Sequence, residues 1–131
     1  MKVTDPRDMN AAFARAFNSR NIDNLLALYA PDATLAVDES GRTATGLDAI
    51  ATELKQLLQA PGTMTSRNNF CIVHGDLALL RADWELVDRD GTVVVGGSTA
   101  EVVRRQPDGS WRYVIDHAAG ASVPRVVPRQ T

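Results

Sequence analysis

Residues 77–118, LALLRADWELVDRDGTVVVGGSTAEVVRRQPDGSWRYVIDHA, decide the fold class of this chain. The stretch is rich in β-branched and aromatic residues, and Asp-Gly pairs at 90–91 and 108–109, which are typical of turns, divide it. Together with the apolar segment before it, the stretch predicts antiparallel strands over residues 64–74, 77–88, 92–106 and 110–118. The pair Gly96-Gly97 predicts a bulge or a sharp bend inside the third strand.

The first half of the chain predicts helices rather than long strands. Apolar residues at helical spacing indicate helices over 5–18, 22–30 and 47–59. Residues 33–37 predict a short strand, for which 43–45 is a candidate partner. Helices followed by a run of antiparallel strands indicate an α+β fold, with the helices packed on one face of the sheet. We therefore expect a cone-shaped, curved antiparallel sheet packed on three N-terminal helices, with a hollow inside.

Length and composition exclude several classes of protein. The 131 residues suffice for one domain, which we place at residues 1–122, with residues 123–131 as a C-terminal tail. A net charge of -2 argues against nucleic-acid binding, for which a basic excess is typical. No apolar run approaches the length of a membrane span, and the N-terminus lacks the apolar core of a signal peptide. We therefore expect a cytoplasmic protein that contacts neither nucleic acid nor membrane.

Four blocks of sequence occur in an order that is typical of a known family. They are FARAFNSRNIDNLLALYAPDAT at 13–34, GLDAI at 46–50, the apolar strand from His74 to Trp84, and DGSWRYVIDHAAGASVP at 108–124. In these blocks the chain resembles the nuclear transport factor 2-like superfamily, and within it the SnoaL-like and ketosteroid isomerase-like bacterial proteins. The last block is also similar to the end of the calcium/calmodulin-dependent kinase II association domain.

The resemblance implies a cystatin-like fold with a mainly apolar pocket, and a homodimer formed through the outer face of the sheet. It does not fix an activity, because this fold hosts isomerases, cyclases, dehydratases, hydrolases and proteins without activity. A ketosteroid isomerase needs a carboxylate base, a tyrosine donor and a carboxylic acid kept neutral by its surroundings. The alignment puts Phe13 at the tyrosine position, Val37 at the base position and Glu101 at the neutral-acid position. We therefore do not expect a standard ketosteroid isomerase.

Glu101 is the first candidate for acid/base chemistry. It shares one face of strand 92–106 with several valines. If that face lines the cone, burial would raise the pKa of Glu101 and make it a general acid near neutral pH. The alternative interpretation is structural, with Glu101 paired to Arg81 or Arg67.

Asp116 and His117 form the second candidate. Adjacent residues of a strand face opposite sides, so only one of them can point into the cavity. The series that contains Tyr113 and Ile115 is the more apolar one and favours His117, whose ordinary pKa suits proton transfer. The family alignment favours Asp116 instead. A bulge would reconcile the two, and the sequence leaves the choice open.

The remaining pocket residues are expected to be mostly apolar or aromatic. We expect the lining to include Phe13, Phe17, Tyr29, Val37, Leu54, Leu58, Phe70, Trp84, Thr99 and Ile115. His74 and His117 are the only histidines, too few for a metal site without carboxylates, and the sequence has no phosphate loop or dinucleotide motif. We therefore expect neither a metal nor a cofactor.

Two functional hypotheses follow from these residues. In the first, the cone binds a small, mostly apolar organic molecule and transforms it by cofactor-free acid/base chemistry of the isomerase, cyclase or dehydratase type. In the second, the chain is a non-catalytic module that binds a ligand or assembles subunits. The placement of polar groups distinguishes them, because an enzyme should direct two titratable groups into one cavity.

Overall fold

The computed structural model describes residues 2–38, 40–124 and 126. Most of the expected tail, residues 125 and 127–131, lies outside the described residues. None of the helices in the described part of the chain is long and apolar enough to cross a membrane. In chain order the elements are η1 (Pro6–Asp8), α1 (Met9–Ser19), α2 (Ile22–Leu26), β1 (Tyr29–Ala36), β2 (Thr43–Thr45), α3 (Leu47–Leu57), β3 (Thr63–His74), β4 (Leu77–Val87), β5 (Val93–Ser98), β6 (Ala100–Arg105) and β7 (Trp111–His117).

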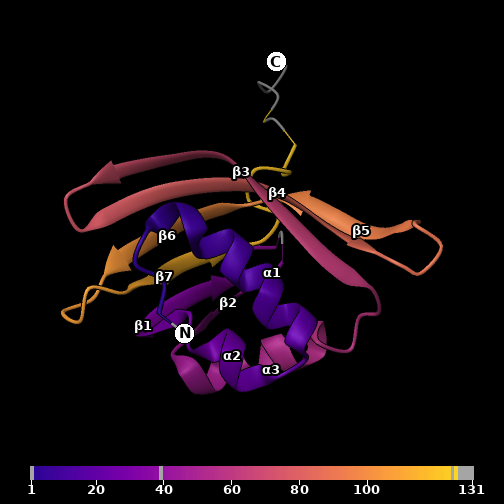
Figure 1. Ribbon diagram of the computed structural model, residues 1–131, viewed down its shortest axis with the longest axis horizontal. Helices are drawn as coiled ribbons and strands as arrows, with labels where there is room; N and C mark the ends of the chain where they lie inside the picture. The colour runs from indigo at the N-terminus through magenta and orange to yellow at the C-terminus, as the bar shows by residue number, and fades with distance from the viewer. Residues whose placement is uncertain (1, 39, 125, 127–131) are drawn as a thin grey trace, which may run out of the picture.

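The expected α+β architecture is confirmed. Seven strands form one sheet in the order β2-β1-β7-β6-β4-β3, and β5 also pairs with β4. The pairs are antiparallel except for β1 and β7, which run parallel. Figure 1 shows the sheet curving over the three helices without closing into a barrel, with α1 crossing beneath the long β3–β4 hairpin. The core therefore lies between the helices and the concave face of the sheet.

Local sequence explains where α1 begins and ends. The Asp5 side chain accepts a hydrogen bond from the Arg7 backbone N–H at 3.0 Å, and Pro6 opens the short η1 turn that leads into α1. At the other end, Arg20 adopts a left-handed conformation with φ of 59°. Its guanidinium donates hydrogen bonds to three carbonyls of the α3–β3 loop, those of Leu58, Ala60 and Gly62. Arg20 thus ties the end of α1 to the loop that precedes β3.

The second helix is shorter than its sequence pattern predicts. It ends at Leu26, and Tyr29 begins β1 instead of ending a helix at residue 30. The reason is long-range pairing, because the backbone N–H of Tyr113 donates to the carbonyl of Leu28 at 2.8 Å and Tyr29 lies opposite Tyr113. Pro31 is tolerated because it falls in the irregular part of the ladder between Tyr29 and Thr34. Pairing with β7 therefore overrides the local helical spacing.

The single strand predicted over residues 92–106 is divided into β5 and β6 at Thr99. The Thr99 backbone N–H donates to the carbonyl of Ala82 at 2.8 Å, and the Ala82 N–H donates to Thr99 Oγ1 at 2.8 Å. A side-chain oxygen thus replaces a backbone acceptor, and the strand changes direction at this point. Gly96, within β5, leaves no room for a side chain, since a Cβ atom there would lie 2.8 Å from the carbonyl oxygen of Trp84.

Candidate functional site

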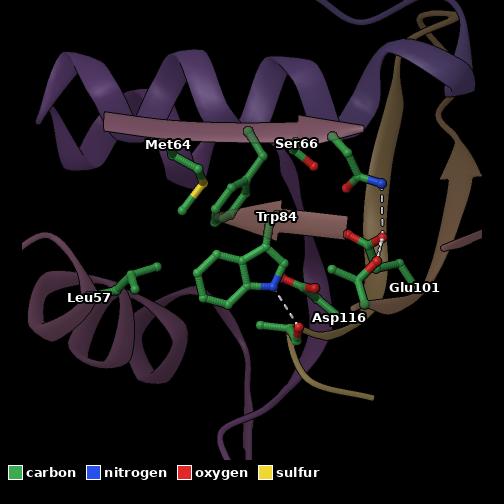
Figure 2. Close-up of a pocket in the computed structure, with 10 residues that line it drawn as sticks. Leu57, Met64, Ser66, Trp84, Glu101 and Asp116 are labelled. Carbon is green, nitrogen blue, oxygen red and sulfur yellow. Dashed lines mark hydrogen bonds between the residues drawn. The ribbon is translucent and has the colours of Figure 1, made fainter. Parts of the chain in front are cut away.

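A recess opens on the concave side of the sheet, and ten described residues line it (Figure 2). Its cavity volume is about 50 Å³. The recess is therefore narrow and suits a small or flat ligand. The lining residues are Asn10 and Phe13 from α1, Leu57 from α3, Met64 and Ser66 from β3, Trp84 from β4, Thr99 between β5 and β6, Glu101 from β6, Asp116 from β7 and Ala118 after it.

Glu101 points into this recess and is held on one of its two oxygens. Oε1 accepts hydrogen bonds from Asn10 Nδ2 at 2.9 Å and from Thr99 Oγ1 at 2.6 Å. The residue is 3% exposed. Both hydrogen bonds favour the ionised form of the carboxyl group, so they oppose the effect of its burial. This geometry differs from the alternative pairing with Arg81 or Arg67, since the hydrogen bonds described for Glu101 come from neutral side chains.

A bulge settles which member of the Asp116–His117 pair faces the recess. Opposite β6, Val102 pairs with Ile115 and Val103 pairs with Tyr113, so Val114 is an extra residue in β7. The extra residue lets Tyr113 and Asp116 both point inward, and Asp116 is 6% exposed. His117 consequently lies on the opposite face of the strand, half-buried.

The Asp116 carboxyl is held by a tyrosine from β1. The hydroxyl of Tyr29, which is fully buried, donates a hydrogen bond to Asp116 Oδ2. Tyr29 therefore contacts the site from behind Asp116 and does not line the recess itself. Its ring packs against Tyr113, with the ring centroids 5.2 Å apart. Asp116 is thus buttressed by a hydrogen bond that stabilises its ionised form.

Burial gives the two carboxyl groups different pKa values. Desolvation, followed by the negative charge of Asp116, raises the pKa of Glu101 from 4.5 to about 8. Desolvation also raises the pKa of Asp116, from 3.8 to about 6, against the opposing effects of the Tyr29 hydrogen bond and the charge of His117. Glu101 and Asp116 are directly paired across β6 and β7, so ionisation of one disfavours ionisation of the other. Near neutral pH the arrangement favours a protonated Glu101 beside an ionised Asp116.

Asn10 connects this pair to the rest of the polar network, although the sequence did not single it out. Its Nδ2 donates to Glu101 and, at 3.1 Å, to Asn68 Oδ1, while its Oδ1 accepts from the Tyr113 hydroxyl at 2.6 Å. Asn10 stands three residues before Phe13, on the same side of α1. A buried polar residue on an otherwise apolar helix face is the signal that could have identified it.

Trp84 forms the central wall of the recess, with Leu57 on one side and Glu101 and Asp116 on the other (Figure 2). Its indole Nε1 donates to the carbonyl of Ala118 at 2.8 Å, which fixes the ring. Gly97 leaves room for this contact, because a Cβ atom there would lie 3.3 Å from Trp84 Nε1. Met64 is held just as firmly, since both its backbone N–H and its carbonyl bind the Asn18 side chain, at 2.8 Å and 3.0 Å.

The structure places the other expected lining residues elsewhere. Phe70 and Ile115 are 39% and 51% exposed and lie on the outer face of the sheet, Ile115 because of the bulge at Val114. Four more belong to the packed core around the recess: Phe17, Val37, Leu54 and Leu58. Leu57, Met64, Ser66 and Ala118 line the recess without having been singled out in the sequence. The alternation of strand residues could have indicated Ser66 and Met64, since they share a face of β3.

Within the described residues, no group of three or more histidine, cysteine, aspartate or glutamate side chains is arranged to hold a metal ion. The recess offers two carboxyl groups, one amide and two hydroxyls against aromatic and thioether walls. This set can exchange protons with a ligand and can hydrogen-bond to it.

Comparison with known proteins gives one family and many similar folds. A family model described as a SnoaL-like domain matches residues 10–114. A proposed calcium/calmodulin-dependent protein kinase type II association domain from Thiobacillus denitrificans is similar in structure, with a TM-score of 0.76 and 21% identity over 91% of this chain and 97% of that one. The comparison with curated proteins finds no match.

Two further solved structures are similar to this chain. A ketosteroid isomerase-like protein from Erwinia carotovora atroseptica has a TM-score of 0.65 and 22% identity over 83% of this chain and 88% of that one. A proposed dehydratase of the nuclear transport factor 2-like family from Streptomyces avermitilis has a TM-score of 0.65 and 19% identity over 85% and 89% of the two chains. At these identities the likeness concerns the fold.

Proposed function

Because this chain belongs to the family of SnoaL-like domains, we propose that its recess binds a small, mostly apolar organic molecule and moves a proton on it without a cofactor. The observation that supports this proposal is the convergence of two buried carboxyl groups, Glu101 and Asp116, on one cavity with apolar walls. Environments that push the pKa values of two neighbouring acids apart are typical of acid/base pairs in enzymes.

The different pKa values of the two acids support a division of roles between them. Asp116 accepts from Tyr29 and is the more easily ionised, so it acts as the base that takes a proton from a carbon atom of the ligand. Glu101 is protonated and donates to the ligand oxygen on which negative charge develops. In an isomerisation Asp116 returns its proton to another carbon. In a dehydration the proton of Glu101 leaves with the hydroxyl group as water.

A chromogenic probe tests this proposal without knowledge of the natural substrate. Ring opening of a nitrobenzisoxazole requires only the removal of one proton by a base, and it releases a coloured cyanophenolate. We expect the wild type to accelerate this reaction and Asp116→Asn to lose roughly 100-fold or more of the rate. Asp90→Asn, the same change in the exposed turn between β4 and β5, is the matched control. Equal rates for wild type and Asp116→Asn, or no acceleration at all, would contradict the catalytic proposal.

The outer face of the sheet supports a second role, assembly with another copy of this chain. One row across β3, β4, β6 and β7 is aliphatic and largely exposed, and it consists of Ile72, Leu79, Val102 and Ile115. Arg104 and Arg112 lie beyond one side of this row, and Asp83 and Glu85 lie beyond the other. A two-fold axis that runs along the row, between two facing sheets, would place the basic side of one copy over the acidic side of the other.

The oligomeric state in solution tests this second role. We expect light scattering after size-exclusion chromatography to give a dimer for the wild type and a monomer for Ile115→Glu. Val93→Glu introduces the same charge on β5, outside the aliphatic row, and should remain a dimer. A monomeric wild type, or a dimer that persists in Ile115→Glu, would rule out this interface.

A further inference from the structure

The recess contains two acidic groups and, among the described residues that line it, no basic one. None of those ten side chains is a lysine, arginine or histidine. Buried carboxyl groups in proteins are usually paired with a cation, because removing an ion from water without a partner is costly. Glu101 is instead surrounded by Asn10, Thr99 and Tyr113, which are neutral. The site is therefore negatively polarised and has space where a cation could sit.

The described groups that face Asp116 also bring no positive charge into the recess. Tyr29 approaches it from β1, Glu101 from β6 and Tyr113 from its own strand, and all three are acids or neutral donors. His117 is the only basic neighbour among the described groups that act on Asp116, and the bulge turns its side chain to the opposite face of the sheet. No positive charge from these elements enters the recess itself.

The walls of the recess also suit a positive charge. Trp84 and Phe13 present aromatic rings, and Met64 presents a polarisable thioether. The N–H edge of the Trp84 indole, its positive edge, is engaged with the carbonyl of Ala118. The electron-rich face of the ring is then available to a ligand, and cations bind favourably over such a face.

We propose that the natural ligand of this recess is a small, flat and mostly apolar molecule that carries one basic nitrogen, bound as its ammonium ion between the two carboxyl groups and the Trp84 ring. The proposal rests on the proposed function in one respect, namely that this recess is the binding site. It also disfavours anionic ligands, because a carboxylate or phosphate would face Glu101 and Asp116 without a compensating cation.

Binding of an ammonium ion should be linked to proton release. A positive charge beside the pair lowers the pKa of Glu101 and Asp116, so protons held by the free protein leave when the ligand enters. The affinity for an amine should consequently rise with pH as the pair ionises, until the amine itself loses its charge. A neutral ligand of the same shape should show neither proton release nor this rise.

Three probes of similar size and different charge test the inference by calorimetry: benzylamine, benzyl alcohol and benzoate. At about pH 7 we expect benzylamine to bind roughly tenfold or more tightly than benzyl alcohol, and benzoate to bind least. Titration in two buffers of different ionisation enthalpy should reveal proton release for benzylamine alone. The double variant Glu101→Gln/Asp116→Asn should bring the ratio of the amine and alcohol affinities to about one. Asp90→Asn/Glu53→Gln, the same changes outside the recess and outside the proposed interface, should leave that ratio as in the wild type.

The outcomes separate this inference from the proposed function. Equal affinity for amine and alcohol, or tightest binding of benzoate, would overturn the inference, whereas turnover of the neutral nitrobenzisoxazole would still stand. Selective binding of benzylamine without any turnover of that probe would support the inference and overturn the catalytic proposal. Failure of all three probes to bind would overturn the inference, and it would overturn the catalytic proposal as well if the nitrobenzisoxazole were not turned over.

Discussion

Replacement of Glu101 by glutamine should abolish most of the loss of stability that the wild type shows when the pH rises from about 5 to about 8. The folded protein keeps the proton of Glu101 up to a pKa of about 8, whereas the unfolded chain releases it near 4.5. The contribution of Glu101 to the unfolding free energy is therefore fully present below about pH 4.5 and is lost progressively as the pH rises towards 8. Glutamine cannot ionise, and its amide oxygen can accept the same hydrogen bonds from Asn10 and Thr99.

The size of the effect follows from the same pKa. One pKa unit corresponds to about 1.4 kcal/mol, so the full shift of Glu101 corresponds to at most about 5 kcal/mol. Within the window from about pH 5 to about pH 8, we expect Glu101 to account for about 3–4 kcal/mol of the fall in unfolding free energy. Asp116, whose pKa is also raised, should leave a residual fall of about 1–2 kcal/mol in Glu101→Gln.

Urea unfolding at several pH values, followed by tryptophan fluorescence, measures these free energies directly. Glu101→Gln should unfold at higher urea than the wild type at about pH 8, and the two midpoints should converge towards about pH 5. Glu85→Gln makes the same change on the exposed face of β4 and should follow the wild type. The reasoning would be refuted if Glu101→Gln lost as much stability as the wild type over this window, or if it were the less stable protein at high pH.

Three further changes test other parts of the structure. Tyr29→Phe removes the donor to Asp116, so it should lower the stability by about 1–3 kcal/mol and, by raising the pKa of Asp116, shift the acidic limb of the nitrobenzisoxazole pH–rate profile to higher pH. An unshifted limb would show that this hydrogen bond does not tune the base. Arg20→Ala removes donors to three loop carbonyls and should cost about 1–3 kcal/mol in urea unfolding, whereas the exposed Arg15→Ala should change little. Gly96→Ala forces a Cβ atom against the Trp84 carbonyl and should lower the unfolding free energy by about 1–3 kcal/mol, and a neutral result would mean that β5 moves freely away from β4.

Sequence predicts well those elements whose conformation is determined by residues close by in the chain. Spacing within α1 and the Asp-Gly turns is local, and the predicted helices and strands occur there in the expected order. The end of α2 depends instead on Tyr113, which lies far along the chain and pairs with Tyr29. The division at Thr99 likewise depends on a hydrogen bond from Ala82 in another strand. No local periodicity contains this information.

The candidate site shows the same limit. Phe13, Trp84 and Glu101 could be assigned to a cavity because their types and their alternation are visible in the sequence. Asn10 could not, because its role depends on three partners from distant segments. The choice between Asp116 and His117 depended on a bulge, which is a property of how two strands match in length and is not encoded by either residue.

That bulge has a consequence for the history of such pockets. Because Val114 is an extra residue, β7 directs the carboxylate of Asp116 into the cavity. With regular alternation after Tyr113, the same sequence would direct the imidazole of His117 there instead. One local change in the backbone can therefore exchange the reactive group of the site while every side chain in the strand stays the same. Lineages that share this strand motif could diverge in chemistry without substituting a reactive residue, so motif matching alone would group them together. Comparisons between such chains should therefore match the pairing of the strands first and the residue types second.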